Sequence, residues 1–210
     1  MRIIAGRFRH RVLLANPGLV TRPITDRVKE SLFARIEAWL PDARIADIYS
    51  GTGTLGFEAL SRGARSVVFI ESDRKAQELL RKNVETLKVQ GETLCWATDA
   101  LRSSFRPRNV DSFVPFDLAF FDPPYQMIED LHPGTPLYRS LERLAKPDVT
   151  SPDAWLILRT PEHSVYELPP PWASEWTLTM SNMTIDVCRK RSADREEGPD
   201  ESPSPSNDLP

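Results

Sequence analysis

Short apolar runs alternate with amphipathic stretches along most of this chain. Five of the runs are rich in Val, Ile, Phe or Trp and have the length of buried strands. They cover residues 44–50, 66–71, 94–97, 117–121 and 154–158. Two further runs, 176–180 and 183–188, flank Ser181-Asn182 and predict an antiparallel pair near the end of the chain.

The stretches between these runs have helical spacing. Thr25 or Asp26 can cap a first helix, which Pro41 ends. Later helices are expected to run up to residues 60–62, over 73–90 and over 138–146, with Gly63 and Gly91 closing the first two of these. Residues 2–6 and 9–14 predict two short strands around a turn.

Strands and helices alternate at the spacing of βαβ units. Such a chain forms a mostly parallel sheet with helices on both faces, so the predicted fold class is α/β. In sheets of this kind ligands bind beyond the carboxyl ends of the strands. Asp47, Glu71, Asp99 and Asp122 all come at or just after the end of a predicted strand. We therefore expect these four carboxylates at one edge of the sheet.

The turn after the first core strand carries a glycine pattern. Gly51-x-Gly53-x-x-Gly56 matches the dinucleotide-binding fingerprint, and Glu71 follows Gly51 by 20 residues. Any nucleoside cofactor laid across such a sheet needs close backbone approach at this turn and an acid for its ribose hydroxyls. The pattern alone does not separate NAD from S-adenosylmethionine, and a tight turn without a ligand is the alternative.

Two aspartates bear on the choice of cofactor. Asp47 precedes the glycines by four residues, where its carboxylate can meet the amino group of a methionine moiety. In an NAD enzyme the same place faces a pyrophosphate, and an acid is unfavourable there. Asp99 can accept a hydrogen bond from the exocyclic amine of an adenine, although a solvated loop aspartate fits its position equally well. Asp47 therefore favours S-adenosylmethionine.

The fourth strand ends in Asp122-Pro123-Pro124-Tyr125. The prolines fix φ and remove two backbone donors, so that a carboxylate, carbonyls and an aromatic ring are held at the strand end. An exocyclic amino group on a base is a poor nucleophile because its lone pair is delocalised. If Asp122 and the Pro123 carbonyl accept its two hydrogens, the lone pair can point at a sulfonium methyl while Tyr125 stacks on the base. A proline-stiffened loop is the alternative.

The formal net charge of −3 hides two segments of opposite sign. Residues 1–35 hold eight Lys/Arg against two acids, a net charge of +6, which favours a nucleic-acid surface over a solvated polar face. The candidate RNA-binding residues are Arg2, Arg7, Arg9, Arg11, Arg22, Arg27 and Lys29. Residues 191–210 hold two arginines against six acids, a net charge of −4, and are expected to be disordered.

Cysteine usage and hydropathy indicate the compartment. Cys95 and Cys188 have no paired spacing, which fits a reducing compartment and excludes a cysteine-based metal cluster. No run reaches the apolar length of a membrane span, and the N-terminus carries charges where a signal peptide needs its apolar core. These observations predict a cytoplasmic protein without a metal site, and we expect a monomer.

Several stretches together resemble a known family. They are residues 1–6, 21–23, 25–33, 50–53, 56–64 and 122–125. The chain resembles the bacterial family that methylates N2 of a guanine in small-subunit (16S) ribosomal RNA, and the resemblance covers residues 1–190. Its most specific parts are the basic N-terminal segment and residues 58–64, Glu-Ala-Leu-Ser-Arg-Gly-Ala, because Asp-Pro-Pro-Tyr is shared by many amino-directed methyltransferases.

The resemblance implies a fold, a cofactor and a substrate. The fold is a class I methyltransferase (Rossmann-like) sheet of seven strands, the methyl donor is S-adenosylmethionine, and the substrate is ribosomal RNA in an assembled or partly assembled 30S particle. Residues 1–35 are then a basic RNA-binding extension, 36–190 the methyltransferase domain and 191–210 a tail. The implied catalytic residues are Asp122, Pro123, Pro124 and Tyr125. The implied cofactor-binding residues are Asp47, Ser50, Gly51, Thr52, Gly53, Leu55, Glu71, Ser72, Asp99 and Ala100.

The chain departs from the family's expected pattern in several places. Arg159 stands at the end of the fifth strand, where an acid is usual. Ile24 and Ala34 replace an expected Thr and Asn, Asn182-Met183 replaces a glycine turn, and loop 126–136 is longer and richer in proline. These departures leave the predicted cofactor site intact and bear on the identity of the target base.

Three other functions remain open. An adenine-N6 methyltransferase acting on DNA would use the same proline turn, but it should carry an added target-recognition domain. An RNA-binding assembly factor could use this scaffold without catalysis, although the intact Gly51, Glu71 and Asp122 argue against it. A nicotinamide oxidoreductase is least favoured, because nothing marks a hydride acceptor site.

Overall fold

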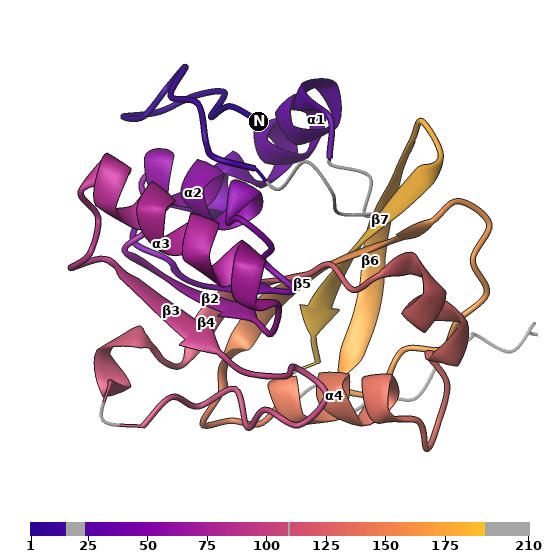
Figure 1. The fold of residues 1–210 in the computed structure, drawn as a ribbon. Coiled ribbons are helices and arrows are strands. Elements are labelled where there is room, and N and C mark those ends of the chain that lie inside the picture. The colour runs from indigo at the N-terminus through magenta and orange to yellow at the C-terminus, as the bar shows by residue number, and fades with distance from the viewer. Residues whose placement is uncertain (16–23, 109, 192–210) are drawn as a thin grey trace, which may run out of the picture.

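The computed structural model describes residues 1–15, 24–108 and 110–191. A seven-stranded sheet runs through the middle of the molecule (Figure 1). Its strands are β1 Arg44–Ile48, β2 Ser66–Glu71, β3 Thr93–Ala97, β4 Phe116–Phe121, β5 Thr150–Pro161, β6 Trp172–Met180 and β7 Met183–Lys190. The tail predicted to be disordered falls, from residue 192 on, outside the described residues.

The strand order is β3-β2-β1-β4-β5-β7-β6. Strands β1 to β5 are parallel, whereas β7 is antiparallel to β5 and β6 is antiparallel to β7. The predicted α/β class and the predicted terminal antiparallel pair are therefore confirmed. The chain leaves β1 toward β2 and β3 on one side and later returns to β4 on the other. The region beyond the carboxyl ends of β1 and β4 is thus the topological switch point, where ligands bind in such sheets.

Helices cover both faces of the sheet. Helices α1 Asp26–Ile36, α2 Thr54–Ser61 and α3 Arg74–Leu87 lie on one face, and α4 Pro136–Leu144 lies on the other (Figure 1). Each face has its own apolar core. Phe120 packs with residues of α1, α2 and α3, whereas its neighbour Phe121 packs with residues of α4. Successive residues of a strand point to opposite faces, so a continuous apolar run supplies both cores.

Side-chain caps confirm two predicted helix starts. Thr25 Oγ1 accepts from the Val28 N–H (3.3 Å), and Asp73 accepts from the Ala76 N–H (2.7 Å). The end of α3 differs from the prediction, because Lys88 rather than Gly91 takes the left-handed conformation, with φ of 58°. The following Val89 is 2% exposed, and its burial in the core favours the earlier stop.

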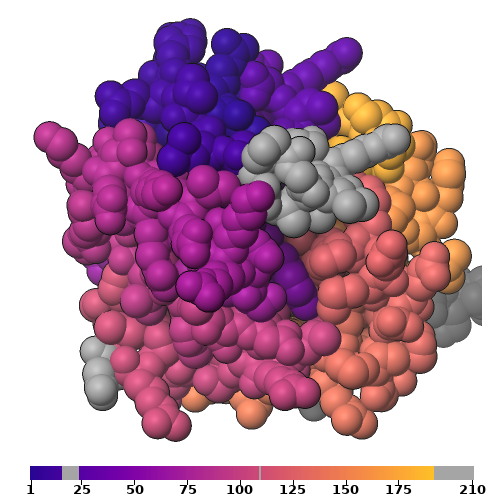
Figure 2. Space-filling view, in the orientation of Figure 1, coloured from indigo at the N-terminus to yellow at the C-terminus, as the bar shows by residue number. Residues whose placement is uncertain are grey.

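Strand β5 is longer than its predicted apolar run, and the predicted N-terminal strands are shorter than theirs. The residues of β5 up to Pro161 pair with β7, so β5 outgrows the predicted 154–158. The two predicted N-terminal strands reduce to a bridge between Arg2 and Val12. Residues 1–14, hereafter the N-terminal hairpin, lie on top of the molecule in the space-filling view (Figure 2).

The described residues of the basic N-terminal segment, 1–15 and 24–35, share the core of the sheet. Ile3 and Leu13 of the N-terminal hairpin and Val28, Leu32 and Phe33 of α1 belong to the same apolar cluster as the sheet. No helix within residues 1–15, 24–108 and 110–191 has the length and apolarity to cross a bilayer.

Candidate active site

The ends of β1, β2 and β4 are joined by backbone hydrogen bonds. The Ser50 N–H donates to the Ile70 carbonyl (3.1 Å), and the Asp122 N–H donates to the Ile48 carbonyl (3.2 Å). The first bond ties the glycine turn to the end of β2, and the second ties the proline turn to the end of β1. Both predicted motifs therefore meet at the switch point of the sheet.

The glycine turn leads from β1 into α2 with a left-handed backbone at three positions. Tyr49, Gly51 and Gly53 have φ of 60°, 55° and 87°. A Cβ at Gly53 would lie 2.6 Å from the ring of Phe57, so packing requires glycine there. A Cβ at Gly51 would have no neighbour within 4 Å. The space beside Gly51 lets a ligand approach the backbone.

Three hydroxyl groups of this turn are buried and lack a hydrogen-bond partner among the described residues. They belong to Tyr49, Ser50 and Thr52. Buried polar groups are nearly always paired, because an unpaired one costs about 1–3 kcal/mol. Tyr49 is also a non-glycine residue in the left-handed region, a kind of strain that gathers at functional sites. The turn therefore has the features of a site for a ligand with several polar groups.

Glu71 at the end of β2 holds the glycine turn in place. Its Oε2 accepts from the Gly51 N–H (2.8 Å), and its Oε1 accepts from the N–H groups of Ser72 and Asp73 (2.8 Å each). An ionised carboxylate has about four acceptor sites, so Glu71 keeps capacity for a further donor. Ser72 contributes its backbone here, while the residue itself is exposed.

Asp47 is 1% exposed, and its Oδ2 accepts from the Gly56 N–H of α2 (2.8 Å). Burial raises the pKa of Asp47 well above its usual range, and the hydrogen bond from Gly56 opposes that rise. The role visible in the structure is therefore to anchor the N-terminal turn of α2. The predicted contact of Asp47 with a methionine amino group stays a prediction.

The remaining predicted cofactor residues are Asp99, which is partly exposed, and Leu55 and Ala100, which are buried. Asp99 follows β3, its side chain is 46% exposed, and its Oδ1 accepts from the Leu101 N–H (2.9 Å), which forms a tight turn. Leu55 and Ala100 are 7% and 3% exposed and belong to the two apolar cores. Their side chains serve the packing beneath the site.

The proline turn is open to solvent on one side. Pro123 is buried, Pro124 is exposed and Tyr125 is half-buried. The Met127 N–H donates to the Pro124 carbonyl (2.8 Å) and begins the 3-10 turn η3 Tyr125–Asp130. The motif is thus rigid and accessible, as a site for a base of a macromolecule must be.

Arg159 of β5 completes the proline turn, and the sequence marks it only as a departure from an expected acid. Its Nε donates to Asp122 Oδ1 at 2.6 Å, and its guanidinium carbon lies 5.7 Å from the ring centroid of Tyr125. Burial raises the pKa of Asp122, and the charge of Arg159 opposes the rise.

Most predicted RNA-binding residues are on the surface. Arg2, Arg7, Arg9, Arg11 and Arg27 are exposed. Arg2 and Arg7 already pair with Asp26 (2.7 Å) and Glu92 (2.6 Å). Such exposed pairs contribute little stability, so a phosphate can compete for these arginines. Arg22 lies outside the described residues.

The assignment of Lys29 to RNA binding is wrong. Lys29 is 1% exposed, its Nζ donates to the Arg2 carbonyl, and it lies 3.7 Å from Glu58 Oε2. Burial lowers the pKa of Lys29, and the Glu58 carboxylate opposes that change. Lys29 is therefore the partner of a buried acid. From the sequence alone a charged helix residue such as Lys29 is expected at the surface, because the buried acid that pairs with it lies far along the chain.

Glu58 anchors the N-terminal hairpin on α2. Its carboxylate is 0% exposed and accepts from the N–H groups of Ile4 (2.8 Å) and Ala5 (3.1 Å). Ser61 Oγ donates to the Ala5 carbonyl at 2.5 Å. Glu58 and Ser61 both lie in residues 58–64, one of the two parts of the chain on which the family resemblance is most specific. These bonds give that stretch a physical role as the mount of the hairpin.

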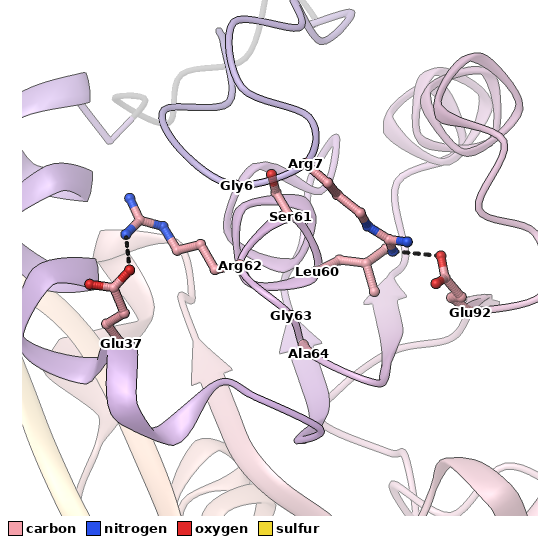
Figure 3. A pocket seen from close by; sticks show the side chains of 9 residues that line it. All are labelled: Gly6, Arg7, Glu37, Leu60, Ser61, Arg62, Gly63, Ala64 and Glu92. Carbon is pink, nitrogen blue, oxygen red and sulfur yellow. Dashed lines mark hydrogen bonds and ion pairs between the residues drawn. The ribbon is translucent and has the colours of Figure 1, made fainter.

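An open pocket of about 530 Å³ lies beside this mount (Figure 3). Its charged lining residues are paired, Arg7 with Glu92 at 2.6 Å and Arg62 with Glu37 at 3.7 Å. The pocket also contains Gly63, which follows the C-terminal end of α2, whereas the glycine turn precedes the N-terminal end. It is therefore separate from the candidate active site.

Asn83 of α3 connects the hairpin to the glycine turn. It is 2% exposed, accepts from the Leu14 N–H (2.8 Å), and donates to the carbonyls of Leu14 and Thr52 (3.1 Å each). The sequence prediction gave this helix its bounds, 73–90, but no role for Asn83. An asparagine next to the inward-facing Val84 is the signal that could have identified it.

Comparisons with known proteins place this chain among methyltransferases. A family model described as Conserved hypothetical protein 95 matches residues 1–184. Ribosomal RNA small subunit methyltransferase D of Haemophilus influenzae is 37% identical over 177 residues, which cover 76% of this chain and 86% of that protein. The protein of the same name from Escherichia coli is 38% identical over 128 residues, 60% of this chain and 61% of that protein.

Solved structures agree on the fold. The protein yhhF of Escherichia coli, provisionally assigned as a methyltransferase, has a TM-score of 0.75 at 29% identity, with 91% of this chain and 98% of that chain covered. An RNA methyltransferase from Salinibacter ruber in complex with S-adenosyl-L-homocysteine has a TM-score of 0.58 at 15% identity, covering 87% of this chain and 100% of that chain. The second likeness shows the fold alone. By the extent of the family match, the chain belongs to the Conserved hypothetical protein 95 family, with ribosomal RNA small subunit methyltransferase D of Haemophilus influenzae as a relative.

Proposed function

We propose that this chain transfers a methyl group from S-adenosylmethionine to the exocyclic N2 amino group of a guanine in small-subunit ribosomal RNA, within an assembled or partly assembled 30S particle. The observation that carries the proposal is the hydrogen bond from the Asp122 N–H to the Ile48 carbonyl (3.2 Å). It holds the proline turn beside the glycine turn, so a base in one would lie next to a cofactor in the other. The relatives named as ribosomal RNA small subunit methyltransferases support the substrate class.

The residues of the glycine turn fit this cofactor. The buried hydroxyls of Tyr49, Ser50 and Thr52 lack partners among the described residues and can bond a polar ligand. Glu71 has acceptor capacity left for a ribose hydroxyl, and Asp99 follows β3, where the carboxylate can accept from an adenine amine. When bound, S-adenosylmethionine supplies an electrophilic methyl group on a positively charged sulfur.

The proline turn prepares the nucleophile. The Asp122 carboxylate and the Pro123 carbonyl accept the two hydrogens of the amino group, which withdraws its lone pair from the ring and directs it at the methyl carbon. Tyr125 stacks on the base, worth about 1–3 kcal/mol. The N–C bond forms as the S–C bond breaks, and the methylated nitrogen then releases its proton to water. No strong base is needed, because the methylated amine cation is acidic enough to lose its proton, and proximity and orientation govern the transfer itself.

The first 35 residues hold the RNA in this proposal. The exposed Arg9 and Arg27 and the weakly paired Arg2 and Arg7 offer cations for phosphates. Because Glu58 and Ser61 fix the hairpin on α2, its cations Arg2, Arg7 and Arg9 keep a constant position relative to the glycine turn.

Parallel substrates test the proposal. The protein is incubated with labelled S-adenosylmethionine and with 30S particles, 16S RNA or duplex DNA, and the modified nucleosides are identified by mass spectrometry. N2-methylguanosine in RNA or particles is the expected result. N6-methyladenine in DNA alone would support the DNA methyltransferase, and RNA binding without cofactor binding in calorimetry would support the assembly factor.

Glu71→Gln is expected to weaken binding of S-adenosylmethionine at least tenfold, or about 1.4 kcal/mol. The amide keeps the side-chain volume but offers a single acceptor oxygen to the Gly51 and Ser72 N–H groups and to the ribose. Isothermal calorimetry measures the affinity. The matched control is Glu78→Gln, whose side chain is 57% exposed on α3 and which should bind as the unchanged protein does. Equal affinities for the two variants would contradict this role of Glu71.

A further inference from the structure

Arg159 gives the proline turn a fixed cationic partner. Strand β5 lies next to β4 with Leu158 opposite Phe121, so Arg159 and Asp122 are neighbours across the sheet. Arg159 Nε donates to Asp122 Oδ1 at 2.6 Å, and the two side chains are 8% and 17% exposed. The guanidinium carbon is also 5.7 Å from the Tyr125 ring centroid. One cation therefore contacts both the first and the last residue of the motif.

We propose that Arg159 is a positioning residue that fixes the Asp122 carboxylate and the Tyr125 ring in the arrangement that receives the target base. This inference rests on the methyl transfer proposed above. Charge-assisted hydrogen bonds of this length are strong and directional, so the Asp122 carboxylate has little freedom to rotate. With Oδ1 bonded to Arg159, Oδ2 is the oxygen left to accept the amino hydrogen. A cation over the Tyr125 ring limits the motion of the stacking surface in the same way.

The charge of Arg159 has a second consequence. The groups that face Asp122 are Arg159 from β5 and Asp47 from β1, with the Tyr125 ring beside the pair. Burial raises the pKa of Asp122, and Arg159 opposes this rise through its charge and its hydrogen bond. Only the ionised carboxylate accepts hydrogens with both oxygens. Activity should therefore fall as the pH drops through the pKa of Asp122, and loss of Arg159 should move this fall to higher pH.

Arg189 offers a matched control. It also pairs with an aspartate, Asp153 at 2.9 Å, and it also lies over an aromatic ring, 5.4 Å from the centroid of Trp155. Trp155 precedes Arg159 by four residues along β5, away from the strand ends that form the candidate site. Arg189→Met therefore removes the same kind of contacts without touching the proline turn.

The experiment compares Arg159→Met, Arg159→Gln, Arg159→Lys and Arg189→Met. Steady-state methyl transfer to RNA gives kcat and both KM values from about pH 5 to pH 9. A ¹³C NMR titration of the Asp122 carboxyl, assigned with Asp122→Asn, follows ionisation without turnover. For Arg159→Met we expect kcat to fall tenfold or more with both KM values nearly unchanged. The midpoint of the acid limb of the pH–kcat profile and the midpoint of the Asp122 NMR titration should both move up by about one pH unit or more.

Arg159→Lys should restore the position of the acid limb and part of kcat, because it keeps the charge but not the planar fork. Arg189→Met should match the unchanged protein in every readout. An Arg159→Met enzyme with normal kcat and a normal acid limb would overturn the inference, as would a loss confined to the KM for RNA. If Arg159→Met does not fold, Arg159→Gln carries the test, and an unshifted Asp122 titration in it would overturn the inference. Absence of methyl transfer by the unchanged protein defeats the proposed function instead, and the NMR titration still tests the pair.

Discussion

Asp122→Ala is expected to lower kcat for methyl transfer about 10²–10³-fold while leaving the affinity for S-adenosylmethionine nearly unchanged. The substitution removes the carboxylate that accepts an amino hydrogen of the base, whereas the glycine turn and Glu71 keep their contacts. Single-turnover transfer of a labelled methyl group measures the rate, and calorimetry measures cofactor binding.

Two companion variants isolate the chemistry of Asp122. Asp122→Ala also leaves Arg159 buried without this partner, so Asp122→Asn, which keeps an acceptor oxygen for Arg159, separates catalysis from stability. Asp130→Ala, at an exposed position of η3, should retain full activity. A rate near that of the unchanged protein in both Asp122 variants would show that this carboxylate does not hold the amino group.

Glu58→Gln is expected to destabilise the protein by about 3–5 kcal/mol. The change removes the buried one of the two carboxylates near Lys29, breaks the 2.9 Å pair of Glu58 with Arg62, and weakens the anchor for the Ile4 and Ala5 N–H groups. For a chain of 210 residues this corresponds to a fall in Tm of about 10 °C, since each kcal/mol shifts Tm by about 2–4 °C. Thermal unfolding measures Tm, and hydrogen exchange at Ile4 and Ala5 reports release of the N-terminal hairpin.

Glu37→Gln is the control for Glu58→Gln. Both glutamates pair with Arg62, but the Glu37 side chain is 67% exposed and its oxygen lies 3.7 Å from Arg62, so its loss should cost less than about 1 kcal/mol. Similar shifts of Tm in the two variants would refute the role of Glu58 as the buried mount.

Features fixed by local chemistry could be predicted from the sequence. The bounds of β2 match the prediction because its apolar run is closed by a polar residue at each end. The cap at Thr25 and the stop at Gly63 follow from side-chain and glycine preferences that act within one turn. The mostly parallel sheet follows from the βαβ pattern, and its seven strands follow from the family resemblance.

Features that depend on pairing between distant residues could not be predicted. The end of α3 at Lys88 depends on burial of Val89, and the length of β5 depends on its pairing with β7. The same limit applies to the site. Lys29 looked exposed because its partner Glu58 lies 29 residues away, and the pairing of Arg159 with Asp122 joins neighbouring strands.

The measurement that tests the central claim most directly is mass mapping of methylated nucleosides in small-subunit ribosomal RNA. Particles from a strain that lacks this protein are incubated with S-adenosylmethionine and either the unchanged protein or Asp122→Ala. The account predicts one new N2-methylguanosine with the unchanged protein and none with the variant. A methyl group on another atom, or no methyl group although calorimetry shows the cofactor bound, would contradict it.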